Sequence, residues 1–408
     1  MTDRFDAIIV GGGMVGATLA LALGAHGLTS AVIDRANLPA TTTPDFDGRV
    51  SAIASASANM LRAIGLADLM DEHGQPILAI RTTDGLSPLH LHFDSAQAGT
   101  GPLGWMIENR TIRARLLEAL AVQPSATLIA PAEVADASRD GPAAMVTLAN
   151  GRRLSAPLIV AADGRQSALR RAAGIRVAEW SYAATALVTS IRHDLPHEGV
   201  AFELFFPGGP FAILPMRDDA NGAHRSAIVW TVRSREAEGW ATLSPRAFAR
   251  ELQTRMDGFL GEVELLTAVT RWPLSFHHAH SFTAPRLALV GDAGHGIHPI
   301  AGQGLNLGLR DVAALTQALV EGARLGLDPG DPAVLARYGR WRALDVTAIS
   351  AATDLLSRLF NIPGHLPALV RQLGLAAVNR LPMLKSAFMA EARGEGGDLP
   401  ALLRGELA

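Results

Sequence analysis

The first 35 residues place the strongest constraint on the fold of this chain. An apolar strand pattern leads into Gly-Gly-Gly-Met-Val-Gly, and an Ala/Leu-rich helix pattern and a second apolar strand pattern follow. In such a βαβ unit Gly11 permits the tight turn, Gly13 lets the backbone approach a pyrophosphate, and Gly16 lets helix and strand pack closely. Asp34, at the tip of the second strand, is placed to accept hydrogen bonds from a ribose. The segment predicts a dinucleotide site without distinguishing NAD from FAD.

Composition narrows the class of protein. The 408 residues are 49% hydrophobic and 18% charged, which is typical of a folded chain with a large core. A net charge of −3 offers no basic surface for nucleic acid, so we expect no nucleic-acid partner. The absence of cysteine excludes disulfides and thiol chemistry, so any redox chemistry must come from a bound cofactor.

The ends of the chain bear on its location. The N-terminus is polar and no apolar run reaches 18 residues, so we expect neither a signal peptide nor a transmembrane helix. Residues 353–373 carry leucines at helical spacing with arginines between them. This pattern favours packing on the domain and also suits a membrane surface. We expect a cytoplasmic protein, compatible with peripheral contact at the inner face of the membrane; the oligomeric state stays open.

Strand patterns of the nucleotide-binding type recur at 158–164 and 286–290, with a β-rich part between them. We expect residues 51–64 to form a helix and the rest of the chain beyond 304 to be mainly helical. The predicted fold class is α/β: a Rossmann-like domain of discontinuous segments, an inserted β-rich substrate domain and a helical C-terminus. The predicted boundaries are 1–75, 101–175 and 271–345 for the nucleotide domain, 76–100 and 176–270 for the substrate domain, and 346–408 for the C-terminal region.

Three further segments carry a family resemblance. They are Asp-Gly-Arg-Val-Ser-Ala-Ile-Ala at 47–54, Asp-Gly-Arg-Gln-Ser-Ala-Leu-Arg at 163–170, and Gly-Asp at 291–292 leading into a glycine-rich segment at 298–311. Together they resemble the class A flavoprotein aromatic hydroxylases, which share the para-hydroxybenzoate hydroxylase fold. The first and third are most similar to the ubiquinone-biosynthesis hydroxylases of the UbiH/UbiF/VisC group. The resemblance covers essentially the whole chain, in order.

The resemblance implies FAD as the cofactor and NAD(P)H as a co-substrate. It places the glycine motif on the FAD pyrophosphate and Asp34 on the ribose, where the family usually has Glu. It implies further cofactor contacts at Arg49, Arg110, Asp163, Gly164, Asp292, Pro299, Gly304, Leu305 and Asn306. Taken alone, Arg49 is better explained by a solvated charge on a loop, and Asp163-Gly164 by an ordinary turn at the end of a strand. Arg110 stands at the start of a helix, where the dipole does not favour a base, and this position favours a ligand.

The loop from Pro299 to Asn306 would wrap the flavin edge, and it is the expected seat of the chemistry. Gly302 and Gly304 expose backbone N–H groups at the start of a helix, where the helix dipole stabilises negative charge on a reduced flavin. No acid or base stands out as a phenol-activating group. His295 and His298 have no acidic partner at ligand spacing, so no metal is expected.

These features favour an FAD-dependent monooxygenase that uses NAD(P)H and O2 to hydroxylate a phenolic ring. The resemblance implies a lipophilic, polyprenylated ubiquinone-biosynthesis intermediate as substrate, and a ubiquinone-biosynthesis complex as a partner. One alternative is a hydroxylase of a small soluble aromatic, or a related epoxidase or halogenase, although a Trp-x-Trp-x-Ile motif is absent. Another is a non-catalytic FAD-bearing subunit of a biosynthetic complex.

Overall fold

The computed structural model describes residues 2–38, 46–98, 101–296, 302–343, 345–346, 371–372, 374, 378–379 and 381–408. Its central sheet has six strands, in the order β20-β21-β13-β2-β3-β9, and the four inner strands run parallel with β9. Their bounds are Thr283–Ala284 (β20), Leu287–Leu289 (β21), Leu158–Ala161 (β13), Ala7–Val10 (β2), Ser30–Ile33 (β3) and Ala126–Ile129 (β9). This arrangement confirms the predicted α/β fold class.

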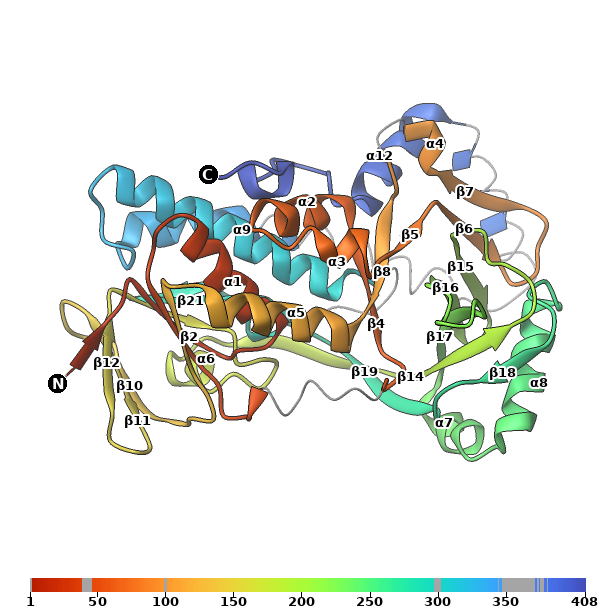
Figure 1. Ribbon diagram of the computed structural model, residues 1–408, viewed down its shortest axis with the longest axis horizontal. Helices are drawn as coiled ribbons and strands as arrows, with labels where there is room; N and C mark the ends of the chain where they lie inside the picture. Colours follow the sequence, from red (N-terminus) through yellow and green to blue (C-terminus); the bar gives the residue numbers. More distant parts are fainter. Residues whose placement is uncertain are drawn as a thin grey trace.

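The central sheet is buried on both faces, which explains its continuous apolar strands. Alternate residues face opposite layers: Ile9 packs in the cluster with the helices, and its neighbour Ile8 packs against the second sheet. The helices of that cluster are α1 (Met14–Ala25), α5 (Asn109–Val122), α2 (Ser55–Ala63), α3 (Asp68–Asp71) and α9 (Gln303–Arg324). Figure 1 shows α1 and α9 side by side above β2 and β21.

A four-stranded sheet covers the other face. Its order is β1-β12-β11-β10, with bounds Thr2–Arg4, Arg153–Ala156, Ala144–Leu148 and Val134–Ser138. A turn at Asn150-Gly151 joins β11 to β12. The strand patterns of this region were not identified from the sequence, although Asn-Gly is a hairpin signal.

A nine-stranded sheet forms the second half of the molecule (Figure 1). Its path is β22-β19-β14-β17-β16-β15-β6-β7, and β18 pairs with β14. The bounds are His295–Gly296 (β22), Thr270–Ala279 (β19), Val177–His193 (β14), His224–Arg233 (β17), Gly209–Met216 (β16), Val200–Phe206 (β15), Ala79–Asp84 (β6), His90–Asp94 (β7) and Val263–Leu265 (β18). Helices α7 (Ser234–Ala241) and α8 (Pro245–Met256) pack on one face, leaving the opposite face toward the nucleotide-type half.

The expected helix over 51–64 is wrong in its first turn. Residues Val50–Ala54 form strand β4, and the helix α2 begins only at Ser55. β4 pairs antiparallel with β8 (Gly104–Glu108), which also pairs with β5 (Gln75–Ile77). The backbone hydrogen bonds of this small sheet come from a segment some 50 residues away in the chain, so local propensity did not reveal them.

The C-terminal part is described in pieces. Residues 332–343 are helical, α12 spans Pro382–Ala392, and η4 spans Ala401–Arg404. The apolar segment 353–373, for which a membrane-surface role was considered, lies almost wholly outside the described residues. Within the described part of the chain, no helix is both long and apolar enough to cross a membrane.

Candidate cofactor and substrate site

The glycine turn between β2 and α1 has the stereochemistry expected of a pyrophosphate cradle. Gly11 has φ +109°, and a Cβ there would collide with the carbonyl oxygen of Ala162. A Cβ on Gly16 would collide with the carbonyl oxygen of Gly11. A Cβ on Gly13, in contrast, would meet no atom within 4 Å. Gly11 and Gly16 therefore serve the turn itself, and the open side of Gly13 is left for a ligand.

Asp34 follows β3 and faces this turn. One oxygen of its carboxylate accepts the Gly12 N–H at 2.7 Å, and the other accepts the Ala36 N–H at 2.8 Å. Each oxygen has a second lone pair with which to accept a further hydrogen bond. Asp34 thus holds the glycine turn and remains able to accept from a ribose hydroxyl.

A cavity of about 410 Å³ opens beside the glycine turn. It is bordered by Gly12, Gly13, Asp47, Arg49 and Arg113, together with apolar side chains of α1 and α5. Two arginines and one aspartate leave an excess of positive charge next to the N-terminus of α1. The donor set fits a diphosphate, as expected for FAD.

Arg49 and Arg113 both border this cavity, but the groups around their guanidinium groups differ. Arg49 donates to the Asp47 carboxylate at 2.7 Å. Burial, and then the neighbouring charge of Arg49, lower the pKa of Arg113. Arg113 was not predicted as a site residue; the available signal was its position three residues after Arg110 on the same helix.

The structure does not place Arg110 at this cavity. Its guanidinium donates to Glu108 at 2.7 Å and lies 5.2 Å from the centre of the Phe46 ring. It borders a separate polar cavity that also contains His73 and Arg225.

The Asp163-Gly164 turn lies at the end of β13. The Asp163 Oδ2 accepts the Ala168 N–H at 2.8 Å, and its buried Oδ1 has no hydrogen-bond partner among the described residues. The buried Arg170 donates to the carbonyls of Arg165 and Ala293, at 2.8 and 2.7 Å. Arg170 therefore ties this turn to the Asp292 turn at the end of the adjacent strand.

Asp292 lies exposed in the turn η2 (Gly291–Ala293) that follows β21. Buried Asp311 of α9 holds this turn by accepting the Gly291 N–H at 2.7 Å. It also bonds to His295 Nε2 at 2.7 Å and accepts from Arg342 Nε at 2.6 Å. Burial opposes ionisation of Asp311, yet the charges of His295 and Arg342 hold its pKa below the ordinary value. The acidic partner of His295, not apparent in its local sequence, is thus a residue of α9.

Helix α9 begins beside a second cavity. Gly302, its N-cap residue, has φ +62° and leaves the first N–H groups of the helix without a side-chain cap. Asn306 in the first turn accepts the Ala54 N–H at 3.0 Å and donates to the Ala52 carbonyl at 2.8 Å. Asn306 therefore clamps α9 to β4. Gly304 and Leu305 lie in the same turn, whereas Pro299 lies outside the described residues.

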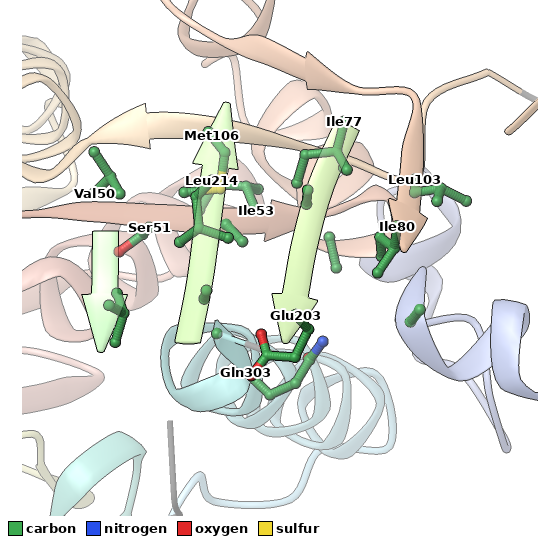
Figure 2. A pocket seen from close by; sticks show the side chains of 18 of the residues that line it. Val50, Ser51, Ile53, Ile77, Ile80, Leu103, Met106, Glu203, Leu214 and Gln303 are labelled. Carbon is green, nitrogen blue, oxygen red and sulfur yellow. The ribbon is translucent and has the colours of Figure 1, made fainter. Parts of the chain in front are cut away.

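The second cavity has a volume of about 220 Å³ and lies between α9, β4 and the nine-stranded sheet (Figure 2). Its walls are mostly apolar, with Ile53, Ile80, Leu103, Met106 and Leu214 among the side chains that Figure 2 shows around it. Leu305 and Asn306 also border it. Such a cavity suits an apolar ring with few polar groups.

Glu203 is the one carboxylate among the described residues that line this cavity, and it was not predicted from the sequence. Figure 2 shows its side chain between the strands of the large sheet and Gln303 of α9. No hydrogen bond or ion pair joins it to any residue of the described ranges. Burial alone raises its pKa to about 7. The available signal was an acid inside an apolar strand, Phe-Glu-Leu-Phe-Phe.

Residues 47–54 connect the two cavities. Asp47 and Arg49 border the cavity of the glycine turn, and Val50 to Ala54 border the cavity of Glu203. One short chain segment therefore borders both cavities, and an elongated ligand lying along it could reach both.

A family model described as an FAD binding domain matches residues 4–352. The chain is 46% identical over 403 residues to the ubiquinone hydroxylase UbiL of Rhodospirillum rubrum, covering 98% of this chain and 92% of that protein. It is 34% identical over 391 residues to the 3-demethoxyubiquinol 3-hydroxylase of Escherichia coli, covering 95% and 97%.

Solved structures share the fold. The p-nitrophenol 4-monooxygenase PnpA of Pseudomonas putida superposes with a TM-score of 0.79 at 18% identity, covering 98% of this chain and 100% of that one. At this identity the likeness concerns the fold and not the substrate.

Proposed function

The chain belongs to the FAD-binding-domain family, and from that premise we propose that it is a monooxygenase of ubiquinone biosynthesis. It would use NAD(P)H and O2 to hydroxylate the phenolic ring of a polyprenylated intermediate. Similarity to ubiquinone hydroxylases over nearly the whole of both chains carries this proposal. The path along residues 47–54, which border both cavities, gives the cofactor and the substrate neighbouring places.

We propose that FAD lies along this path. Gly11, Gly13 and Gly16 form its pyrophosphate turn, Asp34 accepts from the ribose, and Arg49 with Arg113 offsets the phosphate charge. When bound, FAD supplies the redox chemistry and the activation of O2. Further contacts are proposed at Asp163, Gly164, Asp292, Pro299, Gly304, Leu305 and Asn306. We do not extend this set to Arg110, because it borders a different cavity.

The protein's own residues bind and orient the substrate and keep water away from it. The apolar walls around Ile53 and Leu214 exclude water from the ring, which protects reactive groups and strengthens nearby electrostatic interactions. The open N–H groups at the start of α9 stabilise negative charge on the cofactor edge.

We also propose that the protein rests on the inner face of the membrane through α12. Four of its apolar side chains are at least 45% exposed: Leu381 just before the helix, and Met383, Leu384 and Phe388 within it. On the other side of α12, Met389 is buried against the strands of the large sheet. The helix ends at Ala392, which borders the substrate cavity. An apolar surface thus adjoins the site into which a lipid-tailed phenol would move.

The function is tested with purified protein and 2-farnesylphenol, a phenol with a short isoprenoid tail. We expect a flavin spectrum, bleaching by NAD(P)H that the phenol accelerates, and a product carrying one oxygen atom from isotopically labelled O2. A protein that binds no FAD on reconstitution contradicts the proposal. If the protein hydroxylates small soluble phenols but not 2-farnesylphenol, it is the alternative hydroxylase. If it binds flavin but oxidises no NAD(P)H with any phenol, it is a non-catalytic subunit.

A further inference from the structure

We propose that Glu203 is the base that takes the hydroxyl proton of the phenolic substrate. The inference rests on the proposed function and adds a catalytic residue to it. Three observations carry it: the side chain faces the substrate cavity, that cavity holds no other titratable side chain among its described lining residues, and the carboxylate has no partner within the described chain.

The register of the large sheet directs Glu203 into the cavity. Along β15, Phe202 and Leu204 pack toward α8 on the far face, so Glu203 between them faces the opposite way. Its cross-strand neighbours are Ala212 of β16 and Thr82 of β6. Because Ala212 is small, it leaves room beside the carboxylate for a ring.

The other polar groups of the cavity are less suited to accept a proton. Asn306 is occupied by its two hydrogen bonds to β4. The Ser51 hydroxyl donates to Asn109 at 2.7 Å. Thr231 and Gln303 also line the cavity, but both side chains are neutral and do not titrate in the physiological range. A phenol in this cavity therefore finds one group that can become protonated.

The proposed step is a proton transfer. The O–H bond of the phenol breaks, its proton bonds to a carboxylate oxygen of Glu203, and the electron pair stays on the phenolate oxygen. The extra electron density activates the ring carbons ortho and para to that oxygen. One oxygen atom of O2 then enters the ring as the new hydroxyl group; the ring C–H bond at that carbon breaks and its hydrogen leaves as a proton. NAD(P)H supplies the two electrons that reduce the second oxygen atom to water, and Glu203 returns its proton to the phenolate oxygen of the product.

The protonation equilibrium of Glu203 suits this role. Burial raises its pKa to about 7, nearer to that of a phenol, which is about 10. The groups facing it from packed elements are Ala212 (β16), Thr82 (β6), Gln303 (α9) and Ala392, the last residue of α12, and none is charged. The pH dependence of the proton transfer should therefore follow the ionisation of Glu203 itself.

The test compares Glu203→Gln with the wild-type holoenzyme, using 2-farnesylphenol as the probe. We expect unchanged FAD content and a fall in product formation of about 100-fold or more. The wild-type rate should rise with pH through about 7, and the variant should lose this limb. Glu264→Gln, an exposed control, should keep both rate and limb. Product formation within threefold of wild type, with the limb retained, overturns the proposal.

A binding measurement separates this proposal from the proposed function. Wild-type holoenzyme should bind 2-farnesylphenol about tenfold more tightly than its methyl ether, which has no proton to donate. Glu203→Leu should lose this preference and keep its affinity for the ether. If the wild type binds with the preference but forms no product, the proposed function fails while the contact stands. An equal preference in both proteins overturns the Glu203 contact.

Discussion

Three carboxylates of this chain differ in their partners, and the difference decides what each can do. Asp311 has His295, Arg342 and the Gly291 N–H, so its charge is compensated and holds a turn in place. Asp163 accepts the Ala168 N–H with one carboxylate oxygen, and its other oxygen is buried without a partner among the described residues. Glu203 has no partner in the described chain, and burial shifts its equilibrium toward the neutral acid. A carboxyl in that state is poised to exchange a proton.

The raised pKa of Glu203 predicts a pH-dependent stability difference. Between its ordinary pKa of 4.5 and its folded value of about 7, the folded state holds a proton that the unfolded state releases. Stability is therefore lost as pH rises through this window. Glu203→Gln removes the penalty, so the variant holoprotein should gain up to about 3 kcal/mol relative to wild type at pH 8, and much less at pH 4.5. Urea unfolding at pH 8 and at pH 4.5 measures the difference in unfolding free energy between variant and wild type. If this difference is the same at the two pH values, the pKa of Glu203 is not raised in the folded state.

Two glycines of the first turn predict opposite phenotypes. Gly13→Ala places a methyl group in open space, so the apoprotein should unfold at the wild-type temperature while FAD affinity falls by about tenfold or more. Gly16→Ala drives a methyl group into the Gly11 carbonyl, so it should destabilise the fold itself. Thermal unfolding and flavin titration distinguish them. Wild-type FAD affinity in Gly13→Ala would remove this turn from the site.

At the scale of elements, α9 organises both sides of the proposed cofactor path. Asn306 in its first turn is hydrogen-bonded to β4. Asp311, five residues further along the helix, holds the η2 segment that carries Asp292. Arg342 joins this assembly from the following helical segment and also contacts Asp345. A single helix thus sets the distance between two chain segments that are far apart in sequence.

Breaking the Asp311 centre should cost far more than breaking an exposed ion pair. Asp311→Asn leaves the buried guanidinium of Arg342 without its full counter-charge, so we expect a loss of about 3 kcal/mol in unfolding free energy. The control Asp328→Asn removes an exposed partner of Arg286 and should cost less than about 1 kcal/mol. Denaturant unfolding of both holoproteins tests the contrast, and equal losses would show that the centre contributes no more than a surface pair.

Elements with strong local patterns were predictable, and those defined by distant partners were not. Helix α8 has proline in its first turn and a Ser244 cap, and both signals of its start are local in the sequence. Residues 51–54 are Ser-Ala-Ile-Ala, whose three small residues fit either state, and pairing with β8 made the segment a strand. The sheet of β10 to β12 was missed because its strands are short and partly exposed.

The same distinction applies to the candidate site. The glycine motif is local, so its turn and Asp34 could be placed from sequence alone. Glu203 and Arg113 could not, because their roles depend on which face of a strand or helix meets a cavity built by other segments. Arg110 shows the converse, because it lies on the same helix as Arg113 and yet borders a different cavity in the folded chain.

At the scale of the whole molecule, the substrate cavity lies where the nucleotide-type half meets the large sheet, and α12 closes its edge. Figure 1 places α12 toward the end of the molecule that holds β7, against which its Met389 packs, and away from the four-stranded sheet at the other end. The exposed apolar side chains of α12 therefore lie at the substrate end of the molecule. A membrane bound there would deliver a lipid-tailed phenol close to Glu203.

This arrangement predicts that membrane binding and tail length are coupled. The double variant Met383→Ser/Phe388→Ser should lose co-sedimentation with phosphatidylglycerol-containing vesicles, because it removes two of the exposed apolar side chains of α12, one in the first turn of the helix and one in its second half. Its turnover of a vesicle-embedded long-tailed phenol should fall about tenfold, and its turnover of detergent-dissolved 2-farnesylphenol should be unchanged. The matched control Val122→Ser/Leu325→Ser alters side chains that are 80% and 78% exposed, at the end of α5 and just after α9, and it should still sediment with vesicles. If both double variants bind vesicles equally, α12 is not the membrane contact, and the substrate must reach the cavity by another edge.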